Sequence, residues 1–236
     1  MKALFYGIAL QVKLDIRSKS MLITCYLVPL VFFLFMGGIF TSIEPNAAKT
    51  LISSMTVFTI TMSALMGLPP ALAEIYGTDV KKVYKANGAP LWFGVVTQFI
   101  SSFVHTVVVC LIIFAVSPFL FRAELPADLL WYFLSLIALL MVTLAIGCIF
   151  GLLIRQQAKL TMIAMVVFLP SVMLSGILFP AELLPRFLQS IAYAFPATIA
   201  FQAMTNFQAW HIPALLALFA LLCGAIALLL KCKKNG

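Results

Sequence analysis

The chain has 236 residues, of which 64% are hydrophobic and 9% are charged, and its formal net charge is +8. A soluble domain carries about 25% charged residues, so this composition excludes an ordinary soluble fold and indicates a chain whose solvent is lipid. The basic residues are scattered between apolar blocks and form no long patch, which argues against nucleic acid as a partner.

Residues 1–17 predict an amphipathic helix on the membrane surface. Apolar residues recur there at helical spacing, and Lys2, Lys13 and Arg17 lie on one flank, where they can reach lipid phosphates. No small-residue cleavage site follows the short uncharged run after Lys2, so a secretory leader is not expected. The alternative is a disordered tail before the first span. The expected apolar stripe of this interfacial helix consists of Phe5, Ile8, Val12 and Ile16.

Six apolar segments are long enough to cross a membrane, since a helix needs roughly 20 apolar residues to do so. We therefore expect an all-α integral membrane protein with six transmembrane helices, forming one domain over residues 1–236. An interfacial helix precedes the first span, and a re-entrant or interfacial helical hairpin at about 180–209 separates spans 5 and 6. The expected spans are about 21–41, 51–73, 91–118, 129–154, 159–179 and 212–231.

The last uncharged block, 187–230, is long enough for two spans, and the distribution of charge decides between one and two. With six spans and an inside N-terminus, the inside segments carry 12 basic residues and the outside segments carry 3. The positive-inside rule favours this arrangement, which places both termini in the cytoplasm of a plasma-membrane protein. The first half of the block is also rich in polar residues, including Gln202, Asn206 and Gln208.

The second predicted span carries small hydroxyl residues on about a third of its circumference. Such residues either pack helices tightly or line a translocation path between two subunits. Close helix contacts are also expected at Gly147 and Gly151, whose spacing places them on one helix face. Prolines are expected to bend several spans, at Pro29, Pro69, Pro70 and Pro170. The candidate path residues are Ser53, Thr56, Thr59 and Ser63.

Motifs for catalysis or for metal binding are absent from the sequence. There is no G-x-x-x-x-G-K-[ST] segment, so we do not expect the chain to be an enzyme or to bind nucleotide. His105 and His211 are far apart and lack acidic or cysteine neighbours, so no metal site is expected. His105 is instead expected to hydrogen-bond inside the bundle. All seven acidic residues lie outside the predicted spans, which disfavours secondary transport driven by protons or sodium.

The segment LSGILFPAELLP, residues 174–185, interrupts the fifth apolar block. Pro180 is expected to stop the helix near the outer surface, and Glu182 and Arg186 mark a turn. A short amphipathic helix then follows until Pro196 breaks the chain again. This hairpin either seals the bundle as a surface helix or forms an outer gate. The candidate gate residues are Phe179, Pro180, Glu182, Pro185, Phe187 and Pro196.

Two segments resemble the permease subunits of ABC-2 type ATP-binding cassette transporters: EIYGTDVKKVYKANGAP after the second span, and LSGILFPAELLPRFLQSIAYAFP around the fifth. Tyr76 and Val80 depart from the family pattern. The resemblance implies a homodimer or heterodimer of permeases with separate cytoplasmic ATPase subunits, which would bind ATP and Mg, while this chain binds no cofactor. It also implies that Glu74–Asn87 is a coupling helix that docks on the ATPase. The implied coupling residues are Glu74, Tyr76, Gly77, Thr78, Asp79, Val80, Lys81, Lys82 and Tyr84.

The resemblance assigns the chain to an ATP-driven exporter. Apart from Lys159 and Lys231 at their very ends, the predicted spans contain no Lys, Arg, Asp or Glu, which favours a hydrophobic or amphipathic cargo such as a drug, a peptide or a lipid-linked molecule. Sodium export by the same architecture is one alternative. A non-transport membrane subunit, with an immunity or sensor role, is another. On residues alone, the charged loop 74–90 is equally well explained as a solvated segment that sets topology.

Overall fold

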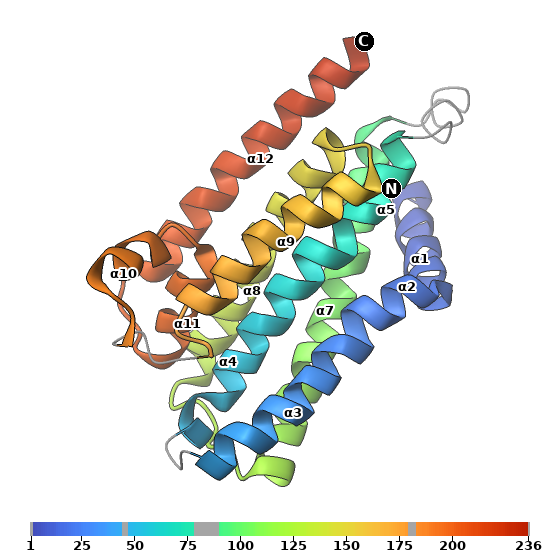
Figure 1. Ribbon diagram of the computed structural model, residues 1–236. Helices are drawn as coiled ribbons and strands as arrows, with labels where there is room; N and C mark the ends of the chain where they lie inside the picture. The colour runs from blue at the N-terminus through green and yellow to red at the C-terminus, as the bar shows by residue number, and fades with distance from the viewer. Residues whose placement is uncertain (1, 44–46, 78–89, 179–182, 236) are drawn as a thin grey trace.

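The computed structural model of the protein describes residues 2–43, 47–77, 90–178 and 183–235, and this part of the chain contains helices but no strands. The helices form a tilted bundle with both termini near one end (Figure 1). Their bounds are α1 Lys2–Arg17, α2 Lys19–Leu22, η1 Ile23–Leu27, α3 Val28–Ile43, α4 Ala47–Met62, η2 Ser63–Gly67, α5 Leu68–Gly77, α7 Trp92–Phe121, α8 Leu129–Leu153, α9 Gln157–Leu174, α10 Arg186–Ala192, α11 Pro196–Thr205 and α12 His211–Asn235.

Six helical segments of the described chain are long and apolar enough to span a membrane, which confirms the predicted class. In the first two, consecutive elements run on as one helix: α2 through α3, and α4 through α5. The spans are Lys19–Ser42, Ala48–Gly77, Trp92–Phe121, Leu129–Leu153, Gln157–Leu174 and His211–Cys232.

The second and fourth spans form the centre of the bundle. Nearly all of Ala48–Gly77 is buried inside the protein, as is most of Leu129–Leu153, whereas the first, fifth and sixth spans are largely exposed. Since the exposed side chains of those outer spans are apolar, they suit lipid as the surrounding solvent. The central position of α4 and α8 is visible in Figure 1, where the other spans surround them.

Glycines allow the fourth span to approach the second at backbone distance. A β-carbon at Gly147 of α8 would overlap the backbone carbonyl of Ala64, and one at Gly151 would lie 2.8 Å from the carbonyl oxygen of Pro69. Only a residue without a side chain fits at this separation. The predicted close contacts at Gly147 and Gly151 are therefore confirmed.

The first two spans each contain one π-helical turn, η1 and η2, and these turns pack against each other. In both cases a proline follows two residues after the turn: Pro29 in α3 and Pro69 in α5. Proline has no N–H, so the carbonyl four residues earlier loses its regular helical partner. A local change to a wider turn is one way in which a helix accommodates this loss. At the contact, Gly67 leaves room for the Cys25 thiol.

The fifth span ends earlier than the sequence suggested. Helix α9 ends at Leu174, and Gly176 then takes the left-handed backbone conformation with φ of 83°. Glycine adopts this conformation readily, and it commonly stops a helix. The expected end at about 179, next to Pro180, is therefore wrong: the helix has already ended at Ser175–Gly176.

Candidate functional site

Tyr76 joins the two helices between which the charged loop runs. The loop begins in α5 and ends at α7. The Tyr76 side chain is only 5% exposed, its hydroxyl donates to the backbone carbonyl of Leu91, and it accepts from the Val95 N–H at 3.1 Å. Val95 is among the first four residues of α7, whose N–H groups have no partner within the helix. The hydroxyl thus caps α7 and fixes it to the end of α5.

The two hydrogen bonds of the Tyr76 hydroxyl, to Leu91 and Val95, are called the Tyr76 clamp below. Two glycines lie close to it. A β-carbon at Gly94 would lie 3.0 Å from the Tyr76 hydroxyl, so Gly94 makes the space that the phenol occupies. Gly77, the last residue of α5, lies beside Arg155 in the connection between α8 and α9. The start of the loop therefore lies next to a second connection at the same end of the bundle.

The sequence-predicted coupling residues divide into two groups. Glu74 and Gly77 are exposed at the end of α5, whereas Tyr76 is buried, so it holds the loop's ends together and is not a surface anchor for a partner. Its burial places the Tyr76 side chain between α5 and α7. The residues that lie outside the described part of the chain are Thr78, Asp79, Val80, Lys81, Lys82 and Tyr84.

The polar stripe of the second span faces the interior of the protein. Ser53, Thr56, Thr59 and Ser63 are all buried, and the Thr56 hydroxyl lies 2.7 Å from that of Tyr132 in α8. The hydroxyls of Thr59 and Ser63 have no hydrogen-bond partner in the described structure. Because the stripe contacts the protein's own helices, its position favours the packing explanation over a path between two subunits.

The outer hairpin consists of two short helices with different environments. Pro185 precedes α10, where Phe187 is exposed, whereas Pro196 occupies the first turn of α11 and is buried. Helix α11 packs on α8, α4 and α12, and Phe207 beyond its end stacks on Trp131 with ring centroids 3.9 Å apart. One arm of the hairpin is thus part of the bundle. Phe179, Pro180 and Glu182 lie outside the described residues.

Helix α1 has one face on α7 and one face exposed. Ile8 and Val12 are half-buried, whereas Phe5 and Ile16 are exposed, at 71% and 51%, and Arg17 is exposed beside them. The predicted apolar stripe is therefore divided between protein and surroundings. Its exposed side includes further apolar residues, namely Tyr6, Leu10 and Leu14.

A buried carboxylate between α1 and α7 was not anticipated from the sequence. Asp15 is 6% exposed, and its carboxylate accepts hydrogen bonds from Gln11 at 2.9 Å, from Gln98 at 3.2 Å and from Ser101 at 2.5 Å. Along α7 the polar stripe continues to His105, whose Nδ1 lies 2.6 Å from the Tyr26 hydroxyl. The predicted hydrogen-bonding role of His105 is confirmed. The sequence feature that could have indicated this polar cluster is the helical spacing of Gln98, Ser101 and His105, which places them on one face of α7.

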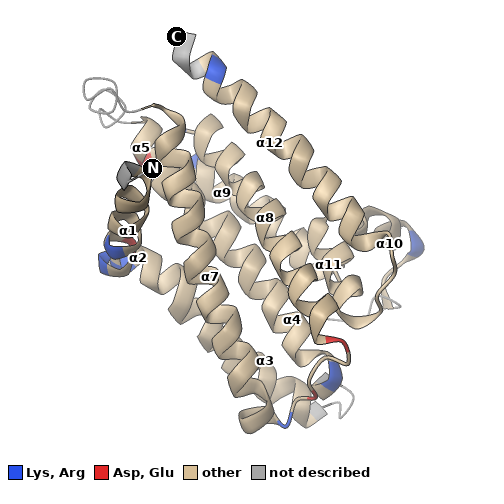
Figure 2. Cartoon of the chain, turned by 180° about the vertical axis from the view of Figure 1, so that it is seen from behind, with Lys and Arg blue, Asp and Glu red and all other residues tan. Residues whose placement is uncertain are grey.

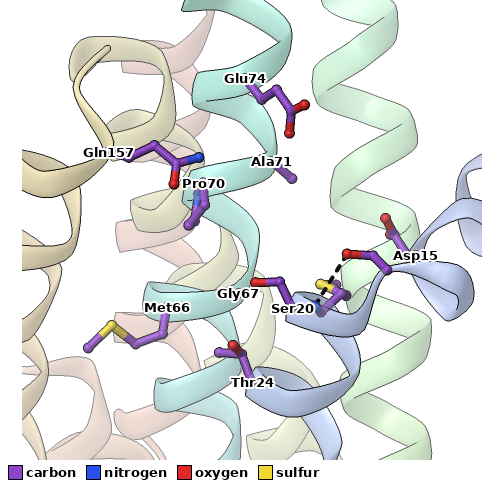
Figure 3. Close-up of a pocket in the computed structure, with 11 residues that line it drawn as sticks. Asp15, Ser20, Thr24, Met66, Gly67, Pro70, Ala71, Glu74 and Gln157 are labelled. Atoms are coloured by element: carbon purple, nitrogen blue, oxygen red, sulfur yellow. Dashed lines mark hydrogen bonds between the residues drawn. The ribbon is translucent and has the colours of Figure 1, made fainter.

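Asp15 also lines a pocket of about 270 Å³ between the first and second spans. Figure 3 shows Asp15 on one side of it, Gln157 of α9 on the other, and Glu74 above them. The lining residues are Asp15, Ser18, Ser20, Met21, Thr24, Met66, Gly67, Pro70, Ala71, Glu74 and Gln157.

Charge is unevenly distributed along the bundle, as Figure 2 shows. Basic residues in α1, at the start of α2, in the α8–α9 connection and near the end of α12 belong to the end that holds both termini. The opposite end carries Lys49, Arg122 and Arg186. Among the described residues, no three His, Cys, Asp or Glu side chains are grouped closely enough to hold a metal ion.

These features define a multi-pass helical membrane protein in which Tyr76 links the second and third spans at the more basic end. The family model for ABC-2 type transporters matches residues 4–209, and the chain belongs to this family. It is thus a membrane permease component of an ABC transporter, a class that acts with an ATPase partner. No curated protein and no solved structure matches the chain significantly.

Proposed function

We propose that the chain is the membrane subunit of an ATP-driven exporter and that loop 74–90 receives the mechanical input from a separate ATPase. The observation that carries this proposal is the Tyr76 clamp, which ties the end of α5 to the start of α7. A force on the loop would reach both spans together, because the Tyr76 hydroxyl links the end of α5 to the start of α7. Family membership supports the same assignment.

The proposed orientation places the loop, the α8–α9 connection and both termini in the cytoplasm. Its support is the charge distribution: the end with the termini carries the greater number of basic residues, and positive residues are retained on the cytoplasmic side. This orientation puts loop 74–90 where a cytoplasmic ATPase can dock. The hairpin with α10 and α11 then faces outward, in the position of an outer gate.

The proposed assembly has two permease subunits, of one kind or two, and two ATPase subunits that bind ATP and Mg. Docking interfaces combine a charged rim with a few apolar anchors. Exposed Glu74 belongs to the rim, as do Asp79, Lys81 and Lys82, while Val80 and Tyr84 are the proposed anchors. Gly77, exposed beside Arg155, is the point at which the docking segment leaves α5.

The proposed cargo is hydrophobic or amphipathic: a drug, a peptide or a lipid-linked molecule. The described spans present apolar side chains outward, and the buried polar residues described in α4 and α7 carry hydroxyl, amide and imidazole groups but include no Lys or Arg. A strongly charged cargo would need paired charges within the membrane.

Reversing the charge of Lys81 and Lys82 together tests the docking role. We expect Lys81→Glu with Lys82→Glu to abolish stimulation of ATP hydrolysis by the permease, and transport with it, in vesicles containing the purified complex. Gly77→Pro should have the same effect because it alters the exit from α5. Lys49→Glu, at the opposite end, is the matched control and should leave both activities unchanged. Normal ATPase stimulation and transport in the loop variants would refute the docking role.

A further inference from the structure

The pocket beside Asp15 opens where lipid reaches the protein. It lies between the α1–α2 junction, the turn η2 with α5, and the first residue of α9. The first and fifth spans that flank it are the outer, largely exposed ones. Large apolar side chains next to the pocket residues in the chain, Leu22 and Ile23, are exposed. A lipid acyl chain can therefore lie along these spans while its headgroup enters the pocket.

The floor of the pocket is acidic although the whole chain carries a net charge of +8. Its described lining includes Asp15, Glu74 and the hydroxyls of Ser18, Ser20 and Thr24, but no basic side chain. All three hydrogen-bond partners of the Asp15 carboxylate are neutral groups. An ionised carboxylate can accept about four hydrogen bonds, so it retains room for one more donor, and a cationic donor suits it best.

The hydroxyls of the lining supply further acceptors beside the carboxylate. A primary ammonium group has three N–H donors, enough to reach the Asp15 carboxylate and a hydroxyl oxygen of the lining, such as that of Ser20 or Thr24, at once.

Two exposed lysines lie close in sequence to residues that line the pocket. Lys19 lies between the lining residues Ser18 and Ser20, and Lys159 follows two residues after Gln157. An acidic lining with lysines nearby in the chain suits a zwitterion whose cationic end enters the pocket and whose phosphate stays at the surface.

We propose that this pocket binds the headgroup of a phospholipid with a primary ammonium, of the phosphatidylethanolamine class, with the ammonium on Asp15 and the phosphate near Lys19 and Lys159. A choline headgroup lacks N–H donors, and a glycerol headgroup lacks the positive charge. The expected order of affinity is therefore ethanolamine, then choline, then glycerol. The pocket shares Glu74 with the proposed docking rim, but Asp15, which binds the ammonium, has no part in the proposed cargo path or in ATPase docking.

Lipid retention by the full chain tests the site. The protein is purified with equal amounts of phosphatidylethanolamine, phosphatidylcholine and phosphatidylglycerol of identical acyl chains, and bound lipid is counted by native mass spectrometry. We expect the ethanolamine lipid to be retained about tenfold over the glycerol lipid, as one charge-assisted hydrogen bond suggests. Asp15→Asn should abolish this preference. Asp128→Asn, at the opposite end before α8, should preserve it.

A second variant separates binding from the folding of α1. Ser20 is exposed and lies outside the Asp15 hydrogen bonds, so Ser20→Leu should fill the pocket without disturbing α1 and should also remove the preference. Equal retention of the three lipids by the unaltered protein, or an unchanged preference in Asp15→Asn and Ser20→Leu, would overturn the proposal. Displacement of the lipid by millimolar sodium would also overturn it, because the pocket would then not require a primary ammonium.

Discussion

Gly147 of α8 lies directly against the backbone carbonyl of Ala64 in the second span, with no side chain between them. This contact and that of Gly151 one turn later bring the two central spans together over the turn η2 and the start of α5. Such close approach lets dispersion forces act between backbones, which is a main source of helix association where lipid surrounds the protein.

Replacing Gly147 by alanine should therefore destabilise the protein. The new β-carbon overlaps a backbone atom, which cannot rotate away, so the spans must separate at a cost of about 1–3 kcal/mol. The measurement is the thermal unfolding midpoint in detergent. Gly224→Ala in α12 is the matched control, because nothing lies within 4 Å of a β-carbon there. Equal midpoints for the two variants would contradict the contact.

Removing the Tyr76 hydroxyl should loosen the two ends of the charged loop. Tyr76→Phe leaves the Val95 N–H and the Leu91 carbonyl without this partner, at a cost of about 1–3 kcal/mol. We expect a lower unfolding midpoint and less transport per ATP hydrolysed. Tyr6→Phe, whose side chain is 72% exposed, should change neither quantity. An unaltered transport-to-hydrolysis ratio in Tyr76→Phe would show that the clamp has no part in coupling.

The polar residues of the second span should differ in their effect on stability. Thr56→Val breaks the hydrogen bond to Tyr132 and should lower stability by about 1 kcal/mol. Thr59→Val replaces a buried hydroxyl that has no described partner, so it should be neutral or stabilising. The measurement is the unfolding midpoint of each variant compared with that of the unaltered protein: it should fall for Thr56→Val and stay equal or rise for Thr59→Val. If Thr59→Val instead abolished transport at full stability, the path explanation of the stripe would prevail.

Labelling with a membrane-impermeant thiol reagent tests the proposed orientation. In a background without native cysteines, Ser190→Cys in α10 should react from outside intact cells because this position is exposed on the outer hairpin. Lys231→Cys, near the end of α12, should react only after the cells are permeabilised. Labelling at Lys231→Cys from outside would place the C-terminus outside and refute the six-span orientation.

The sequence predicts the spans well because hydrophobic length is a local property. Each of the six expected segments corresponds to a helix, and the glycine pair at Gly147 and Gly151 already indicated a close contact. The predicted end of α9 was placed too late because proline is the stronger helix breaker by sequence, which favoured Pro180. Gly176, which comes earlier in the chain, takes the left-handed conformation and ends the helix before Pro180 is reached.

The interior of the site could not be predicted in the same way. Asp15 lies outside the predicted spans, so its burial depends on how α1 docks against Gln98 and Ser101, which are more than eighty positions away in sequence. The family resemblance placed Tyr76 among the coupling residues because it lies in the charged segment 74–87. Only the packing of α5 on α7 shows that its hydroxyl is used inside the protein.

The paired π-helical turns at 23–27 and 63–67 also affect how these spans tolerate changes in length. A π turn holds one residue more than a regular turn, so deleting a residue such as Ala64 would convert η2 to ordinary helix and leave the flanking segments facing as before. The same deletion at Ile52 would rotate the residues on one side by about 100° and turn the hydroxyl stripe away from Tyr132. These two short segments are therefore the places where each span can shorten without losing its alignment to its neighbours.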